Sequence, residues 1–408
     1  MKHSLSIRVF LAILAFGIVM GIALMAPHVP DIDENAYRHM AEGHVQEVCR
    51  PYSSRILHPF LLRALVGFGL THESCGVALN VVSGIVLLSC LLLLLRRVFP
   101  PSLEESTTCG WRKFAWELHV FGLLCVPIWW TWSTGRYMHD FFATAVSAVL
   151  FLVLIPPKSV AREGESEGRI SGGRLALVFC LLVILQMTRE STWVLTIVLT
   201  VLAIRRRQFR LALLSLLALF AGSAAVAWVS HGAPGPVTGL PLPLYLLSKA
   251  LANGCANLLG VTPWNDAYAR MLPLMYPDEP VWQIALPFRV GNISAVGIYS
   301  FSPSVVWSTF GHWLLAFPGA LLLLVYTLLL KFEARICGKG DLTMRKNVPL
   351  GVQLALIAGF IYWLSVPFAG RSGFRLIGYA WPLFWIAIPY FHFRQIESRR
   401  DPKWTSGE

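Results

Sequence analysis

The sequence predicts an all-α, polytopic membrane protein that forms a single integral membrane domain over residues 1–408, and three observations support this. Of the 408 residues, 56% are hydrophobic and 14% are charged, whereas soluble domains carry about a quarter charged residues. The shortage of charge extends along the whole chain. About ten apolar runs, most of them near the ~20 residues that cross a bilayer, alternate with polar loops. They cover residues 7–25, 76–95, 114–132, 141–155, 175–187, 192–204, 211–229, 305–330, 350–366 and 377–391.

The lysines and arginines orient these predicted transmembrane helices. If the N-terminus lies in the cytoplasm, every inner loop is basic, and the inner segments hold 23 of the 34 lysines and arginines. The short tail at 393–408 is then cytoplasmic as well. This bias, together with contact with anionic lipids, explains the net charge of +12, so nucleic acid is not expected as a partner.

The outer loop at 26–75 follows the first apolar run and begins with a cluster of three carboxylates. Asp31, Asp33 and Glu34 lie where the chain leaves the membrane, and charge near the apolar slab is costly and tends to mark function. The loop predicts two interfacial helices. Tyr37 shares a face with Asp33 by i, i+4 spacing in the first, and Arg55 belongs to the polar face of the second. A packed cap with solvated charges is the plainer alternative, but it explains three clustered acids less well.

A short second outer loop follows an aromatic belt of tryptophans and contains Arg136, His139 and Asp140. Asp140 opens the next apolar run, a position where an aspartate is often only an N-cap. No Cys/His spacing typical of a metal site occurs, so no metal ligands are assigned. A divalent cation assisted by His139 and Asp140 stays open as an alternative.

Two further outer segments carry charge. Arg189 and Glu190 split the region 175–204, which favours a hairpin of two short helices with a tight outer turn. The plain interpretation of these two residues is a mutual or inter-helix ion pair. Arg371 and Arg375 have no acidic neighbour in the last outer loop, so they suit an anionic partner, either lipid headgroups or a substrate phosphate.

The outer loop at 231–303 is the longest one. Its length predicts a lid or a binding element, and its pattern predicts an amphipathic or re-entrant helix at 244–259. The inner loops contain no glycine-rich phosphate-binding motif, so an energy-coupled pump is unsupported.

These patterns resemble the GT-C superfamily of membrane glycosyltransferases, which use polyprenyl-phosphate-linked sugars. The family has an Asp-Glu pair followed by a tyrosine in its first outer loop, an aspartate opening a later span, a charged turn, and a late outer arginine near an aromatic-proline pair. Many members also carry a folded domain after the last span, where this chain has only a short tail. The corresponding residues in this chain are, in order, Asp33-Glu34-x-x-Tyr37, Asp140, Arg189-Glu190, Arg371 or Arg375, and Trp381-Pro382.

The resemblance implies inverting transfer of a sugar from a polyprenyl-phosphate donor to a glycan, lipid or protein acceptor. It places the reaction at the outer face of a bacterial inner or plasma membrane, as in bacterial mannosyltransferases and aminoarabinose transferases. A carboxylate is needed to take the proton of the acceptor hydroxyl, and positive charge must stabilise the departing phosphate. Asp33 is the candidate base, with Glu34 as a helper and Asp31 as the rival. The substrate-binding candidates are Tyr37, Arg55, Arg136, His139, Asp140, Arg189, Glu190, Arg371 and Arg375.

Two alternatives remain beside this hypothesis. A secondary transporter or flippase is expected to hold ionisable groups or broken helices near the middle of the bilayer, whereas the charges here gather at one predicted face. A polymerase or ligase of lipid-linked glycans shares the need for outer arginines, but it has less need of the Asp-Glu pair in the first loop.

Overall fold

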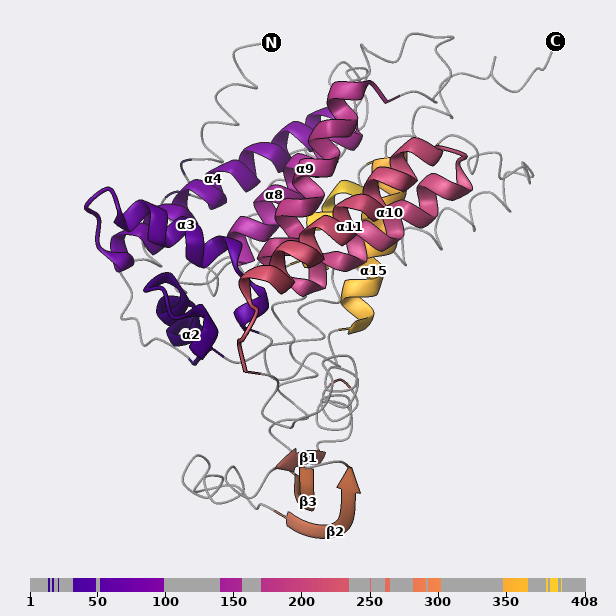
Figure 1. Ribbon diagram of the computed structural model, residues 1–408. Coiled ribbons are helices and arrows are strands. Elements are labelled where there is room, and N and C mark those ends of the chain that lie inside the picture. Colours follow the sequence, from indigo (N-terminus) through magenta and orange to yellow (C-terminus); the bar gives the residue numbers. More distant parts are fainter. Residues whose placement is uncertain are drawn as a thin grey trace, which may run out of the picture.

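The computed structural model is predominantly helical in the part of the chain that it describes (Figure 1). Six helices coincide with predicted apolar runs, whereas the runs at 114–132 and 305–330, and nearly all of 7–25, lie outside the described residues. The run at 377–391 is helical at its described positions. The described residues are 14, 17, 21, 32–48, 52–98, 140–155, 170–234, 250, 261–264, 282–290, 293–301, 348–365, 379–380, 382–387 and 390.

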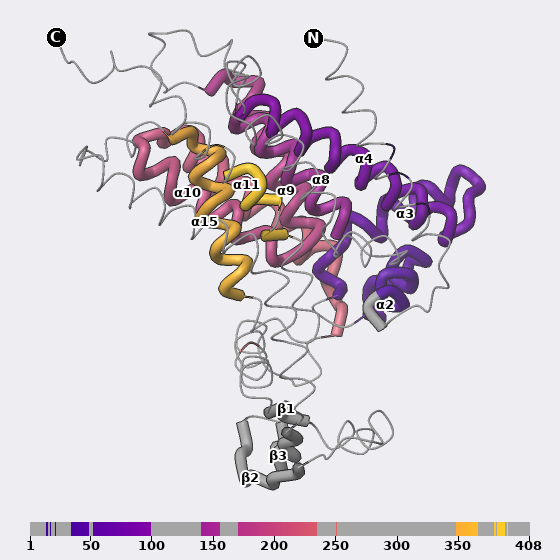
Figure 2. Tube along the Cα trace, turned by 180° about the vertical axis from the view of Figure 1, so that it is seen from behind, coloured from indigo at the N-terminus to yellow at the C-terminus, as the bar shows by residue number. Residues whose placement is uncertain are grey.

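The six longer helices pack side by side as a bundle (Figures 1 and 2). In a closed circuit of contacts, α8 packs against α9, α9 against α11, α11 against α10, α10 against α15, and α15 against α8; α4 joins from outside through α8. A Cβ added to Gly222 of α11 would overlap the side chain of Gln186 in α9, so glycine permits this close approach. The helices are α4 His72–Val98, α8 Asp140–Leu154, α9 Gly172–Thr188, α10 Trp193–Arg205, α11 Phe209–Val229 and α15 Leu350–Ser365.

The outward face of this bundle is apolar. Helices α4 and α11 are long and apolar enough to cross a membrane, and α8, α9 and α15 are shorter apolar helices. Only 22% of the most apolar window of α11 is buried, so α11 differs from the core helix of a soluble protein. Contiguous exposed apolar surface of this kind is expected where helices face lipid. The exposed side chains of α10 and α11 include Ile197, Val201, Leu213, Leu217, Phe220 and Trp228.

Two long-range contacts align one end of the bundle. The guanidinium of Arg97, at the end of α4, donates a hydrogen bond to the carbonyl of Ile155 (2.6 Å) just after α8. The guanidinium of Arg206, which follows α10, donates to the carbonyl of Val348, which precedes α15. The C-terminal ends of α4 and α8 therefore lie together, as do the end of α10 and the start of α15.

The segment predicted to be the first outer loop forms a small helical unit at the opposite end of the bundle (Figures 1 and 2). Helices α2 (Ile32–Ala41) and α3 (Leu57–Val66) pack on each other with two short 3-10 turns, η1 (Val45–Glu47) and η2 (Tyr52–Ser54). Tyr37, Met40 and Ile56 are fully buried in its core, against the ends of α9 and α11. The two predicted helices are thus present, but Arg55, expected on a polar face, is instead buried.

A small antiparallel sheet was not anticipated by the all-α prediction. Strand β3 (Ile293–Phe301) lies between β1 (Val261–Trp264) and β2 (Trp282–Val290). The pairing of Val290 with Ile293 leaves a two-residue connection, Gly291-Asn292, a sequence typical of a tight hairpin. The prolines of β1 and β2 are on edge strands, where a missing amide donor is tolerated. The predicted helix at 244–259 lies outside the described residues apart from residue 250.

Candidate functional site

The charged turn between α9 and α10 is held by a threonine. The Thr192 hydroxyl lies within hydrogen-bond distance of the carbonyls of Leu185 (2.8 Å) and Arg189 (2.7 Å), which also accept the backbone N–H groups of Arg189 and Thr192, respectively. Arg189 has extended backbone, and Glu190–Thr192 form a single 3-10 turn, η5, before α10 begins. The predicted tight turn is therefore present. It presents two adjacent charged side chains to different neighbours.

Arg189 is paired with the start of α8. Its guanidinium forms an ion pair with Asp140 Oδ1, and the Tyr379 hydroxyl donates to the same oxygen at 2.9 Å. The guanidinium also lies over the Tyr379 ring, with its carbon 5.2 Å from the ring centroid. The Asp140 side chain is fully buried and that of Arg189 is 10% exposed. Three segments that are far apart in the sequence are thus joined at one carboxylate.

Glu190 is paired with Arg55, which precedes α3. Arg55 donates through Nε to Glu190 Oε2 at 2.8 Å and through Nη2 to Oε1, which is the bidentate geometry that makes arginine–carboxylate pairs strong. The Nη1 of Arg55 donates to the Tyr37 hydroxyl. The guanidinium carbon also lies 6.0 Å from the ring centroid of Tyr37 and 5.7 Å from that of Tyr52. Glu190 therefore ties α2 and the approach to α3 to the end of the bundle.

The pKa values around this turn follow from burial and pairing. Burial alone would raise the pKa of Glu190, but the charge and hydrogen bonds of Arg55 outweigh it and lower the pKa to about 2. Burial likewise would lower the pKa of Arg55, and Glu190 with Tyr37 raises it instead. Since a depressed acid pKa contributes stability above its unfolded value of roughly 4.3, the Arg55–Glu190 pair stabilises the fold until the pH falls toward 2.

His58 and two tyrosines complete the surroundings of the ion pairs. Burial lowers the pKa of His58 in α3 to about 4, against an opposing effect of the Asp140 carboxylate, so the imidazole is neutral at pH 7. The Tyr362 hydroxyl of α15 donates to the carbonyl of Ser191 at 2.9 Å, and its ring lies 5.8 Å from that of Tyr379. The charged turn is thus held from α15 through the carbonyl of Ser191 and from α8 through the guanidinium of Arg189.

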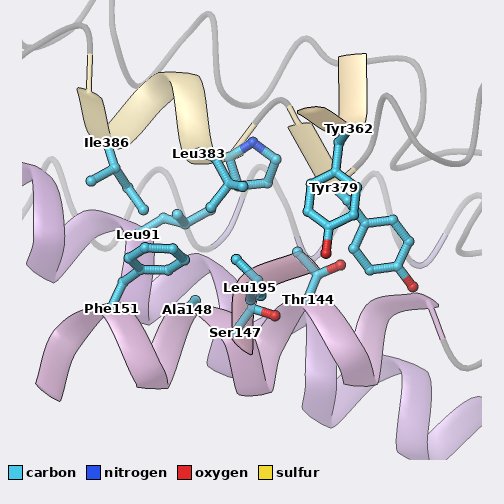
Figure 3. A pocket seen from close by; sticks show the side chains of 11 residues that line it. Leu91, Thr144, Ser147, Ala148, Phe151, Leu195, Tyr362, Tyr379, Leu383 and Ile386 are labelled. Carbon is cyan, nitrogen blue, oxygen red and sulfur yellow. The ribbon is translucent and has the colours of Figure 1, made fainter. Parts of the chain in front are cut away.

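A narrow cavity lies beside these tyrosines in the described bundle (Figure 3). Tyr362, Tyr379 and Thr144 line one end of it, and Phe151 and Ile386 line the other. Its volume of about 10 Å³ is at the lower limit for one water molecule. This cavity is therefore too small for a sugar or for a lipid chain.

Five predicted site residues converge at this end of the bundle. Each of the five is engaged with another side chain of the group or with Tyr379. Glu34, also predicted, is buried in α2 with 2% exposure. The backbone of Asp33 lies in the first turn of α2, and its side chain is not described; Asp31, Arg136, His139, Arg371 and Arg375 lie outside the described residues. The five that converge are Tyr37, Arg55, Asp140, Arg189 and Glu190.

Three of the residues around this network were not among the predicted site residues. His58 follows Arg55 by three positions, so helical spacing alone would have placed the two near each other. Tyr362 and Tyr379 each approach the turn from more than 150 residues away. Their sequence signal is limited to a tyrosine near one end of an apolar run.

The arrangement is a charge-balanced network in which two arginines meet two carboxylates, and it is largely buried, with the Glu190 side chain 25% exposed. It fixes α2 and the approach to α3, the start of α8, the α9–α10 turn and Tyr379 relative to one another. Among the described residues, Asp140 Oδ2 and Arg189 Nε are buried without a hydrogen-bond partner, so the network keeps one unused acceptor and one unused donor. A comparison of the chain with known protein families, with curated proteins and with solved structures gives no match.

Proposed function

We propose that this chain is a polytopic membrane glycosyltransferase that transfers a sugar from a polyprenyl-phosphate donor to an acceptor at the outer membrane face. The observation that carries the proposal is the convergence of five candidate residues, spread from Tyr37 to Glu190, at one end of the helix bundle. That end lies opposite the one where Arg97 and Arg206 contact neighbouring segments. A polar cluster at one end suits an enzyme that works at one leaflet better than a transporter with a site at mid-bilayer.

The described contacts are compatible with ten crossings and with cytoplasmic termini. Alternating crossings place the end of α4 on the same side as the end of α8, and the end of α10 on the same side as the start of α15; the contacts within each pair agree with this. They also require Asp140, Arg189 and Tyr379 to share the outer side, and these three residues are in contact. The basic segments 96–97 and 205–210 then face the cytoplasm, as the positive-inside rule expects.

This topology predicts opposite labelling of two exposed phenylalanines. In a cysteine-free background, Phe68→Cys after α3 is expected to react with a membrane-impermeant maleimide in intact cells, and Phe209→Cys at the start of α11 only after permeabilisation. The two side chains are 84% and 67% exposed, so accessibility to the reagent is comparable once the membrane is open. Labelling of both positions from the same side of intact cells would contradict the proposed orientation.

In the proposed reaction, Asp33 takes the proton of the acceptor hydroxyl as the sugar leaves the phosphate. Asp33 lies one helical turn before Tyr37, whose hydroxyl accepts a hydrogen bond from Arg55. Arg55 is in turn paired with Glu190. The network then acts by positioning the base on α2, because its arginines are occupied by carboxylates. Glu34 is the helper next to the base, and Asp31 remains the rival. A divalent cation at His139 and Asp140 is not needed for these roles and stays an open alternative.

The donor phosphate is assigned to Arg371 and Arg375, His139 with Asp140 is assigned to orienting the acceptor, and Arg136 stays a substrate-binding candidate. Arginine suits a phosphate because its planar fork donates two parallel hydrogen bonds. Arg55 and Arg189 already donate to carboxylates, so they are less available for this task. The departing phosphate therefore needs the late-loop arginines for its charge to be stabilised.

The experiment compares cells that express the chain with cells that lack it, using envelope glycans as the readout. If the proposal holds, one sugar is lost from glycans, lipids or proteins in the deletion, and purified protein transfers that sugar from its polyprenyl-phosphate form. A flippase would instead change the side on which the lipid-linked sugar is found, without consuming it. Unchanged glycans together with no transfer by the purified protein would overturn the proposed function.

A further inference from the structure

A second polar cluster lies on the exposed side of the first outer loop, away from the buried network. His39 is in the last turn of α2, His44 precedes η1, and Glu47 ends η1. The side chains of His44 and Glu47 are 48% and 63% exposed, so solvent ions can reach them. Neither histidine contributes to the ion pairs of Arg55 or Arg189 in the described structure.

The ligand atoms of these three residues already face one another. His44 Nδ1 is 2.8 Å from Glu47 Oε1, and His39 Nε2 is 3.2 Å from Glu47 Oε2. One ligand atom from each residue lies within 4.8 Å of the other two. A tetrahedral ion with bonds of about 2.0–2.2 Å to nitrogen and oxygen holds its ligands roughly 3.3–3.5 Å apart, so only small side-chain movements are needed.

The surroundings of His39 match the support that metal-bound histidines usually have. While Nε2 faces Glu47, the other nitrogen, Nδ1, lies 3.7 Å from Glu42 Oε2, slightly beyond hydrogen-bond distance, so a small movement of Glu42 would bring the two atoms together. Glu42 in turn accepts a hydrogen bond from Arg38 Nε at 2.9 Å. A carboxylate on the second ring nitrogen fixes the tautomer and orientation of a ligating imidazole. The rings of His39 and His44 are stacked with centroids 4.6 Å apart and an angle of 13° between their planes, so one ring must rotate for both nitrogens to bind the same ion in the plane of their rings.

We propose that His39, His44 and Glu47 form a binding site for a divalent transition-metal ion, with Zn²⁺ as the best fit. Zinc commonly binds two imidazoles together with one carboxylate, whereas magnesium and calcium take oxygen ligands. Three protein ligands leave a fourth coordination position. An open groove lined by His39, Glu42, Glu47 and Tyr52 adjoins the cluster and provides room for water or an anionic ligand in that position.

The ion would join the end of α2 to η1. That segment carries Val45 and Val48, which pack in the same small core as Tyr37 and Met40. Metal binding is expected to hold the exposed side of the first loop, just as Arg55 holds its buried side. The site does not rest on the proposed sugar transfer, since its ligands and its test are separate from that activity.

The test is a titration of the purified, chelator-treated full-length protein with Zn²⁺ alone, followed by calorimetry. The wild type is expected to bind one Zn²⁺ per chain. Glu47→Gln removes a charged ligand and is expected to weaken binding by more than 100-fold. Glu42→Gln leaves the three ligands in place but removes the support of His39, so a loss of about tenfold is expected.

Two controls separate this site from adventitious zinc binding. His231→Gln removes another exposed histidine, which lies after α11, and is expected to leave the affinity unchanged. The double variant His39→Gln, His44→Gln is expected to abolish saturable binding while its helical circular dichroism stays that of the wild type. The proposal is overturned if the wild type binds no stoichiometric Zn²⁺, or if the double variant binds it as tightly as the wild type.

Discussion

Asp33→Asn is expected to abolish sugar transfer while leaving membrane expression and folding unchanged. A positioned general base contributes typically 10²–10⁴-fold to the rate, and asparagine of nearly the same shape cannot take a proton. The position is in the first turn of α2, where a carboxylate also interacts favourably with the helix dipole, an effect worth typically about 0.3–1 kcal/mol. The measurement is transfer of radiolabelled sugar by protein in proteoliposomes, at matched protein amounts.

Asp31→Asn is the matched control for Asp33, because it makes the same chemical change two residues earlier, before α2 begins. It is expected to retain most of the transfer activity. Glu34→Gln tests the helper role and is expected to reduce transfer less than Asp33→Asn does. Near-normal transfer by Asp33→Asn would reject this residue as the base, and loss of transfer only in Asp31→Asn would assign the base to Asp31.

The helices of the bundle could be predicted because the length of each apolar run is a local property of the sequence. The turn at Arg189 and Glu190 could also be predicted, since two adjacent charges inside an apolar region need partners. The inter-helix ion pair, which the sequence left open beside a mutual one, is the arrangement found: each residue is paired with a different segment. The prediction of ten crossings remains a proposal, because among the described residues only two helices, and not ten, meet the length and hydropathy expected of a span.

The partners within the network could not be predicted. Glu190 is 135 residues from Arg55, and Asp140 is 239 residues from Tyr379. Such pairings depend on which helices become neighbours, and neither helical periodicity nor charge distribution in one sequence contains that information. The burial of Arg55 was missed for the same reason, since a lone arginine near a predicted interfacial helix is expected at the polar face. The sheet was missed because its strands lie in a long loop, whose length alone suggested a lid.

Arg189→Met is expected to be among the most destabilising single substitutions in the described bundle. It removes the guanidinium from a fully buried carboxylate, Asp140, and leaves that charge with only a tyrosine hydroxyl. Breaking a buried pair by removing one partner typically costs about 3–5 kcal/mol. Thermal unfolding in detergent should show a large drop in midpoint. Arg210→Met, which makes the same change at an exposed position of α11, is the control and is expected to shift stability by no more than about 0.5 kcal/mol.

The double variant Arg189→Met, Asp140→Leu tests whether this ion pair only supports the fold or also takes part in the reaction. Without either charge no buried ion remains unpaired, and only the Tyr379 hydroxyl loses its bonds to the pair, so much of the lost stability should return, as it does when buried ion pairs are replaced by apolar residues. If transfer activity returns with stability, the pair acts by holding the α9–α10 turn against α8. If stability returns and activity does not, Asp140 or Arg189 takes part in the reaction through the atoms left unbonded in the network, Oδ2 and Nε. A single variant Arg189→Met as stable as Arg210→Met would contradict the assignment of this ion pair as a buried structural contact.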